Sequence, residues 1–479
     1  MKAKRLLSLF VSVLIIAFMC SATVLAAEPN LPDGMTEWTD AKPVYYNGAY
    51  YDTLKEALNA VYMSSPAETA EIYCKPGSDV GAMTHAHVAD DIIIYGNGAR
   101  VSGGEHDMEF DTYKYDRATG KQSASGVSLD KDITVTVKDL NGIAAWGQRT
   151  TDKVVNLVFE NCQDMNRVYI SGKMGQNNIS LTNCSFVAAN GSHANTSIYS
   201  NASGTVLISN CVFEGIAIPI NMNNKSNGTQ IISVKNCTFN DCAVSENAAA
   251  VNAAAYAAPV RVLAQEGAVS NLSVEATTFS YSEGKVQAGN GDILLGDGRH
   301  DSFSASGQPE ATGTVTLAME NTKANIQVQT PGYYASDNSV ADAAKAELTE
   351  VTESEKVSAD TDKHFTVACA HRNMQKTEKT DATCVKQGNI DYWSCPDCDK
   401  LFSDENGTTE IKLEDTVIEV AEHNYVDGKC TVCGALDPAE NPSDTDDNSN
   451  MLLCFALLLS GTVGLACAVV CGKKRKSVR

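Results

Sequence analysis

A short segment that recurs along the middle of the chain constrains the fold more than any other feature. Each copy alternates apolar and polar residues and then ends in Asn-Cys, and in three copies a Phe lies two residues past the Cys. Alternation with a period of two predicts a half-buried β-strand. Equivalent positions are 22, 27 and 26 residues apart, so one copy is too short to bury a face alone and the copies must stack. The copies are Val155–Cys162, Ile179–Cys184, Val206–Cys211 and Ile231–Cys237.

A second apolar segment accompanies each copy, and no helical pattern separates them. The chain is therefore predicted to be mainly β, a solenoid with two or three short strands per turn. The second segments are Arg167–Ile170, Ser197–Tyr199, Ala217–Ile220 and Pro259–Val262.

This pattern resembles the right-handed, single-stranded parallel β-helix of pectate-lyase-like proteins, over residues 70–335. The resemblance implies that the repeated asparagines occupy tight left-handed turns and form a hydrogen-bonded ladder. It also implies that the cysteines beside them point inward as small apolar fillers. Upstream, residues 28–69 are expected to form an N-terminal cap, with a helix within Tyr50–Tyr62 that Thr53 caps. The asparagines are Asn161, Asn183, Asn210 and Asn236.

The two ends of the chain predict export and tethering. Residues 1–27 have a basic start, an apolar run and small residues, which are typical of a signal peptide. Residues 451–471 carry no charge and are long enough to span a membrane, and the basic tail 472–479 is expected to stay cytoplasmic. The polar spacer 438–450 before this run gives an order that resembles sortase-type anchors of Gram-positive surface proteins, although Asp446 replaces their Gly. We therefore expect the protein at the outer face of the membrane or in the cell wall.

The net charge excludes one class of partner. The sequence has 37 Lys and Arg against 59 Asp and Glu, a formal charge of −22. Such a field repels phosphate backbones, so nucleic-acid binding is not expected. Tight binding of polyanionic sugars would require a bridging cation.

Catalytic residues are harder to find than the fold. The best candidates lie in the glycine-rich stretch 289–301, where acids, a base and a calcium site would fall within ten residues. A second weak set comprises Glu105, His106, Asp107 and Asp111, while His85 and His87 alternate on one predicted face. Solvated surface loops are the preferred interpretation of both sets. The residues of the first set are Asp292, Asp297, Arg299, His300 and Asp301.

After an acidic linker, residues 336–362, a cysteine- and histidine-rich module is predicted over 363–437. Two Cys-x-x-Cys pairs, Cys395/Cys398 and Cys430/Cys433, each present two thiolates, and together they would complete one tetrahedral zinc site. The sequence of this module resembles the zinc-ribbon-like modules of Gram-positive surface proteins. That resemblance places His371, Cys384, Cys395, Cys398 and His423 in one unit, with Cys430 and Cys433 in another. Disulfide bonding of the six cysteines remains the alternative for an exported module.

Together these features predict a tethered surface protein. The favoured function is adhesion, by binding an extracellular glycan or a protein on a host or neighbouring cell surface. The alternative is a polysaccharide lyase or glycosidase that uses the stretch 289–301.

Overall fold

The computed structural model describes residues 30–439, except 34, 36, 103–106, 173, 188–195, 252, 254–256, 266, 298–312, 329–348 and 361–364. The described residues form two compact units that separate after Ala370, and each is described by itself. The predicted signal peptide, membrane span and basic tail lie outside the described residues, so they stay predictions. No helix within the described part of the chain has the length and apolar character needed to cross a membrane.

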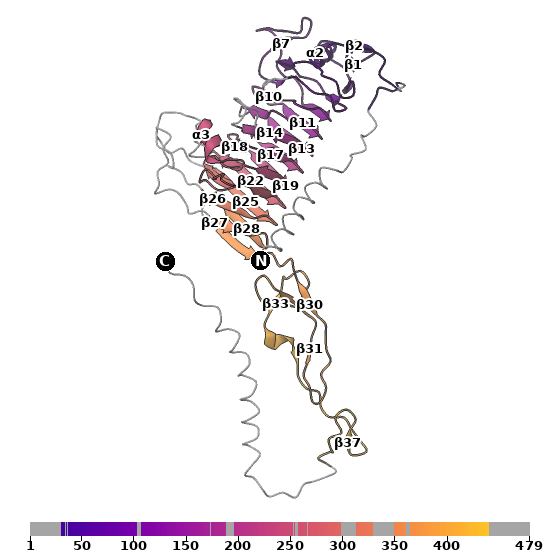
Figure 1. The fold of residues 1–479 in the computed structure, drawn as a ribbon, viewed down its shortest axis with the longest axis vertical. Helices are drawn as coiled ribbons and strands as arrows, with labels where there is room; N and C mark the ends of the chain where they lie inside the picture. The colour runs from indigo at the N-terminus through magenta and orange to yellow at the C-terminus, as the bar shows by residue number, and fades with distance from the viewer. Residues whose placement is uncertain are drawn as a thin grey trace. The chain divides into compact units, whose positions relative to one another are not determined.

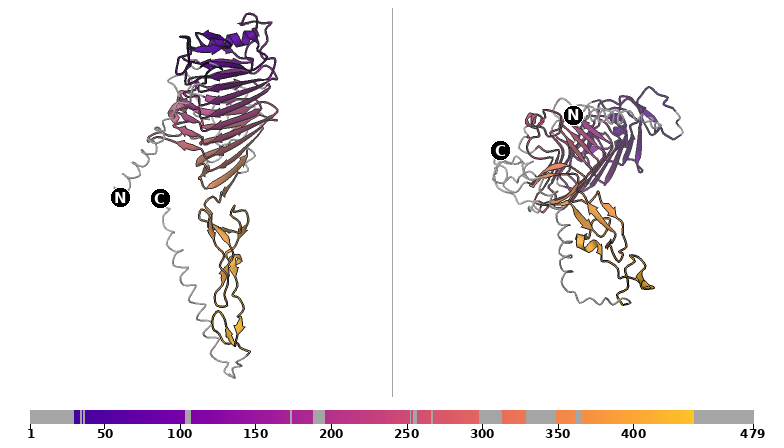
Figure 2. Two further views of the ribbon diagram at one scale, coloured as in Figure 1. Left: turned by 90° about the vertical axis from the view of Figure 1, so that its right-hand side faces the viewer. Right: turned by 60° about the horizontal axis from the view of Figure 1, so that its bottom comes forward.

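The first unit is built mainly from parallel strands, and most neighbouring strands of a sheet are one repeat apart in the sequence (Figures 1 and 2). The chain visits the sheets in rotation, so the arrangement is that of a β-helix-like solenoid, as the repeat predicts. The longest sheet has 13 strands. In spatial order they are β2 (Ala49–Tyr51), β1 (Val44–Tyr46), β3 (Ala70–Cys74), β5 (Ile92–Tyr95), β9 (Ile133–Lys138), β11 (Val154–Glu160), β13 (Gln176–Thr182), β16 (Gly204–Ser209), β19 (Thr229–Lys235), β22 (Val269–Glu275), β25 (Thr314–Glu320), β28 (Glu355–Asp360) and β29 (Phe365–Cys369).

A ten-stranded sheet and a four-stranded sheet complete the stack. The predicted second segments of the repeat all lie in the ten-stranded sheet. Its strands, in spatial order, are β27 (Thr349–Val351), β26 (Ala324–Val328), β24 (Ile293–Asp297), β21 (Val260–Ala264), β18 (Ile218–Asn224), β15 (Thr196–Ser200), β12 (Val168–Ser171), β10 (Ala145–Gln148), β6 (Met108–Phe110) and β4 (Ala86–His87). The four-stranded sheet contains β14 (Ser185–Val187), β17 (Val212–Glu214), β20 (Thr238–Asn240) and β23 (Thr278–Ser280).

Like residues stack on like inside this unit because neighbouring repeats pair in register. The inward cysteines, Cys162, Cys184, Cys211 and Cys237, are all buried, as predicted. The phenylalanine that follows each of three cysteines pairs with its counterpart one repeat on, and Phe213 lies 5.1 Å from Phe186 and 4.8 Å from Phe239 between ring centroids. The core is therefore a set of parallel columns of side chains along the stack.

The repeated asparagines turn the chain out of the long sheet. All four have positive φ angles, between 52° and 57°, in the left-handed region that Asn tolerates better than most residues. Nδ2 of Asn183 donates to Oδ1 of Asn161 at 3.0 Å, which confirms one step of the predicted ladder. The backbone N–H of each asparagine also bonds to a carbonyl of the next repeat, for example Asn210 to Lys235 at 3.0 Å. Each turn is thus fixed to the next.

Both ends of the first unit are closed. At the start, helix α2 (Leu54–Ser64) is capped by Thr53, whose side chain accepts from the N–H of Glu56, as predicted. At the other end, β27 and β28 pair antiparallel with the last parallel strands. The acidic linker predicted over 336–362 therefore includes two strands that belong to the first unit. These two strands pair with the backbone groups at the open edges of the sheets, which would otherwise remain unpaired. Their alternating sequence turns Val351, Val357 and Ala359 into the core.

Short insertions and the second unit account for the remaining elements. The hairpin β7 (Tyr115–Asp116) and β8 (Lys121–Gln122) and helix α3 (Ser245–Ala250) branch from the first unit. The second unit has only short elements and little core. They are β30 (Gln375–Thr377), β31 (Gly388–Asn389), β32 (Tyr392–Cys395), β33 (Lys400–Phe402), β34 (Glu410–Ile411), the 3₁₀ helix η4 (Leu413–Thr416), β35 (Val417–Ile418), β36 (Tyr425–Val426) and β37 (Lys429–Cys430).

The aromatic column predicts a large stability effect at its centre. Phe213→Ala removes a fully buried ring that contacts rings on both sides, and we expect a loss of about 3–5 kcal/mol in the free energy of unfolding. Leu207→Ala on β16 is the matched control, because Leu207 is 44% exposed and its loss should cost less than about 0.5 kcal/mol. Urea unfolding followed by circular dichroism measures both. Equal effects of the two substitutions would contradict the column.

Candidate metal centres

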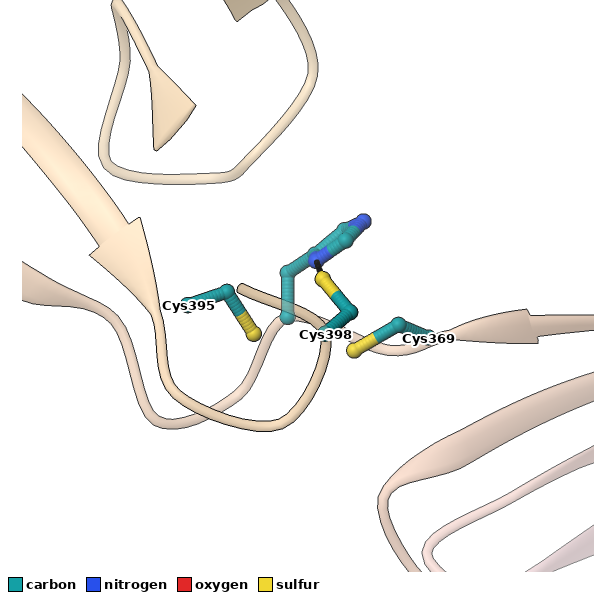
Figure 3. A group of neighbouring side chains, drawn as sticks. Cys369, Cys395 and Cys398 are labelled. Carbon is teal, nitrogen blue, oxygen red and sulfur yellow. Dashed lines mark hydrogen bonds between the residues drawn. The ribbon is translucent and has the colours of Figure 1, made fainter. Parts of the chain in front are cut away.

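Two clusters of cysteine and histidine lie in the C-terminal part of the described chain. The first joins Cys369, His371, Cys395 and Cys398, and their potential ligand atoms all lie within 4.8 Å of one another. Sγ of Cys398 is 3.6 Å from Nδ1 of His371. Figure 3 shows the three thiols turned toward a common point. Cys395 and Cys398 reach it from the turn that follows β32, and Cys369 from the end of β29.

The second cluster joins Cys384, His423, Cys430 and Cys433 under the same 4.8 Å limit. Sγ of Cys384 lies 3.5 Å from Sγ of Cys430, and Sγ of Cys433 lies 3.3 Å from Nδ1 of His423. Cys430 ends β37, and the tight turn after it brings Cys433 back, with the N–H of Gly434 donating to the carbonyl of Cys430 at 2.9 Å. The loop that carries Cys384 comes from much earlier in the sequence.

Each cluster fits one tetrahedral metal ion. Zn–S bonds of about 2.3 Å and Zn–N bonds of about 2.0 Å place neighbouring ligand atoms about 3.3–3.8 Å apart. The three distances given above, 3.3, 3.5 and 3.6 Å, lie in this range. A disulfide would require about 2.05 Å between sulfurs, and all described cysteines are unbonded. The N–H groups of Cys433 and Val432 lower the pKa of Cys430 to about 5, whereas burial and the neighbouring thiols raise the pKa of Cys384 to about 11, so Cys430 is the thiol of this pair that more readily forms the thiolate that binds metal. Three thiolates and one imidazole form a donor set suited to zinc.

The grouping of ligands differs from both sequence-based expectations. The two Cys-x-x-Cys pairs do not share a cluster, because each pair lies next to a different histidine and a different third cysteine. The unit inferred from resemblance is also divided, since Cys384 and His423 join Cys430 and Cys433 rather than Cys395 and Cys398. Cys369 is one of the six cysteines of the module, and it is not among the ligands that the sequence predicts. Its spacing to His371, with one residue between them, was the available signal.

The catalytic candidates of the stretch 289–301 do not form a described site. Arg299, His300 and Asp301 lie outside the described residues, as does the side chain of Asp297, whose backbone ends β24. Asp292 is buried: its carboxylate accepts from the hydroxyl of Tyr281 and from the N–H of Asn325 at 2.7 Å. Burial raises its pKa. These bonds tie Asp292 to neighbouring segments, so its described role is structural.

The second weak set is also divided. Glu105 and His106 lie outside the described residues. Asp111 is buried and accepts from the N–H groups and hydroxyls of Thr150 and Thr151. One oxygen of Asp107 accepts from the N–H of Ala144 at 2.8 Å, while the other is buried without a hydrogen-bond partner in the described structure. Both carboxylates are therefore enclosed.

The outward face of the long sheet carries rows of polar side chains, among which Leu207 and Ile231 are also exposed. Nδ2 of Asn178 donates to Oδ1 of Asn156 at 2.8 Å, and Nδ2 of Asn156 lies 3.2 Å from Oγ1 of Thr134. Farther along the same sheet, Oγ1 of Thr316 donates to Oδ1 of Asn271 at 2.8 Å. A second row, made of ion pairs, lies four residues farther along the same strands, namely Lys138–Glu160, Lys235–Glu275 and Lys356–Glu320. Polar groups thus recur at the spacing of the strands.

Comparison of the chain with protein-family models, with curated proteins and with solved structures finds no match. What the chain does must therefore be argued from its own residues and their geometry.

The two clusters predict two metal ions per chain. We expect the purified full chain to contain two equivalents of zinc, measured by plasma mass spectrometry with native mass spectrometry. Cys395→Ser and Cys433→Ser should each remove one equivalent, and the double variant should remove both. If one shared ion joined the two pairs, either single substitution would abolish the whole content, and a metal-free protein without titratable thiols would favour disulfides.

Asp107 predicts a pH dependence of stability. Burial raises the pKa of its carboxyl from 3.8 to about 6. The folded protein therefore holds this proton more tightly than the unfolded chain, and the stability due to this group falls as the pH rises from about 4 to about 6. Asp107→Asn removes the buried charge, so the variant should match the wild type near pH 4 and exceed it at pH 7 by about 2 kcal/mol.

Urea unfolding at pH 4, 5, 6 and 7 measures this difference. Asp152→Asn is the matched control, because the Asp152 side chain is 83% exposed and its loss should leave the pH dependence unchanged. Parallel stability curves for the wild type and Asp107→Asn would contradict the prediction.

Proposed function

We propose that this chain is a surface-displayed binding protein whose solenoid recognises an extracellular glycan through the outward face of the long sheet. The observation that carries this proposal is the ladder from Thr134 through Asn156 to Asn178, with amide and hydroxyl groups held in register on adjacent strands. Because the backbone beneath it is fixed by sheet pairing, this face presents hydrogen-bonding groups at low entropic cost.

Charge narrows the class of ligand. The negative charge of the chain disfavours polyanionic sugars, whereas hydroxyl and amide groups suit the hydroxyls of a neutral glycan. A protein on a host or neighbouring cell is the other class of ligand that a flat polar face accommodates.

The other parts of the chain hold this face outside the cell. The first unit is a right-handed parallel β-helix, and the second is a zinc-ribbon-like module in which each cluster holds one Zn²⁺. Since this module buries few apolar residues, the two ions replace a hydrophobic core as its source of stability. The signal peptide and the apolar run 451–471 would place the solenoid outside the cell on a tether.

Cleavage of a polysaccharide is less well supported than binding. Asp292, the one candidate carboxylate of 289–301 whose side chain the structure describes, is buried and engaged by Tyr281 and Asn325. Hydrolysis of a glycosidic bond needs two carboxyl groups that face the substrate.

A glycan array with a parallel panel of extracellular-matrix proteins tests the proposal on the purified full chain. We expect binding to neutral oligosaccharides. The double variant Asn156→Ala and Asn178→Ala should weaken it at least about tenfold, since two hydrogen bonds contribute about 1–3 kcal/mol.

Gln148→Ala is the control, because Gln148 is an exposed amide on β10 of the ten-stranded sheet. It should leave the affinity unchanged. Binding only to proteins would replace the glycan with a protein partner, and blank results on both panels would overturn the proposal.

A further inference from the structure

A hollow lies on the outward face of the long sheet, where strands β19, β22, β25 and β28 run side by side (Figure 1). Its volume is about 230 Å³. Pockets that take drug-sized ligands measure about 300–1,000 Å³, so this hollow has room for a group no larger than one sugar ring. Given the glycan binding proposed above, on which this step rests, we propose that the hollow binds an amino sugar with a free ammonium group, carried by a cationic glycan.

Small side chains form the floor of the hollow. Ser233, Ser273 and Ala318 stand in register on three successive strands. Leu207, which is in register with Ser233 on the next strand, is much larger and is 44% exposed, so the low floor ends there. The two serine hydroxyls and the alanine methyl group offer a sugar ring both hydrogen-bond partners and an apolar contact.

Two carboxylates and an ammonium group line one side of this floor. Glu275 and Glu320 stand in register on β22 and β25, and Lys356 is in register with Glu320 on β28. Nζ of Lys235 lies 2.9 Å from Oε2 of Glu275, and Nζ of Lys356 lies 3.8 Å from Oε2 of Glu320. Across the four strands the charges therefore run positive, negative, negative, positive.

The two glutamates face each other at the centre of this row. Neighbouring strands lie about 4.7–4.9 Å apart, and like charges opposite each other on adjacent strands are unfavourable. A ligand ammonium group placed against both Glu275 and Glu320 would be attracted by each carboxylate. The ion pair with Lys235 does not exhaust Glu275, because a carboxylate offers about four acceptor positions. A cation is therefore the best electrostatic complement to this side of the hollow.

The charge of the whole chain favours the same ligand. The formal charge of −22, which disfavours polyanionic sugars, attracts a cationic one. The side chains of Glu275 and Glu320 are each 43% exposed, so a ligand reaches them without any opening of the fold.

A glycan suits this surface better than a basic peptide. Strands β19, β22 and β25 each pair with a neighbour on both sides, so a peptide could not add to the sheet through its backbone. An extended glycan that lay along the stack would instead place about one sugar residue on each strand. Only β16 separates β19 from β13, so such a chain would also reach the amide of Asn178.

The test measures the affinity of the purified full chain for two hexasaccharides by isothermal titration calorimetry at pH 6. One is the hexamer of β-1,4-linked glucosamine, whose amines are protonated at this pH, and the other is its uncharged N-acetylated form. We expect the charged hexamer to bind at least about tenfold more tightly, because hydrogen bonds between ionised groups are about twice as strong as those between neutral groups. Added salt should reduce this difference.

Variants locate the effect. Glu275→Gln should remove most of the preference for the charged hexamer and leave the affinity for the N-acetylated hexamer within about twofold. Glu160→Gln is the matched control, because Glu160 lies in the same row of ion pairs, 3.1 Å from Lys138, and its side chain is 40% exposed. The two variants carry the same net charge, so a difference between them reports the hollow rather than the field of the chain.

A third variant tests the shape of the hollow. Ala318→Leu fills the floor without a change in charge, and it should weaken binding of the charged hexamer at least about tenfold. Ala318 is exposed, and circular dichroism should show the fold of the wild type.

The contrary outcomes are distinct. Equal affinities for the two hexamers, or equal effects of Glu275→Gln and Glu160→Gln, would overturn the proposal. Polylysine that binds as tightly as the charged hexamer and is weakened by Glu275→Gln would overturn it in favour of a basic protein.

The double variant Asn156→Ala and Asn178→Ala separates this proposal from the function proposed above. If both hexamers bind equally and only the double variant weakens them, the hollow fails as a site for amino sugars and the amide ladder stands. If only the charged hexamer binds and the double variant has no effect, the hollow stands and the ladder fails.

Discussion

In-register pairing of successive repeats is the constraint on which the first unit depends. Once Val155 pairs with Asn177 and Leu157 with Ile179, every inward column is determined, because a slip by one residue would turn each buried side chain outward. The left-handed asparagine at the end of each copy keeps that register, since it ends the strand at the same place in every repeat. The same regularity that packs phenylalanine on phenylalanine inside also sets amide beside amide outside. Core and candidate binding face are therefore two results of one periodicity.

Much of this fold could be predicted because its signals are local and repeated. The alternation before Cys162, the asparagine turns and the capping residue Thr53 each act within a few residues of sequence. The antiparallel closure by β27 and β28 could not be found in the same way. Its strands are short, their surroundings are acidic, and their pairing partners are fixed only when the last repeat presents an open edge. A local pattern carries no information about such an edge.

The metal clusters show the same limit in another form. The Cys-x-x-Cys spacing identifies two ligands of one ion because a tight turn suffices to place them. The third and fourth ligands come from distant segments, so their assignment depends on chain tracing that the spacing does not determine. Cys384 lies between ligands of the first cluster in the sequence and yet belongs to the second.

The order of ligands along the chain has a mechanical consequence. The segments that the two clusters enclose, 369–398 and 384–433, overlap rather than follow one another. A force applied at the C-terminal end would first load the second cluster, through His423, Cys430 and Cys433. The first cluster would bear tension only after the second had opened. The two clusters would therefore open in two successive steps, and each step would lengthen the chain by the residues that its cluster encloses. Such stepwise extension would limit the peak force on the module.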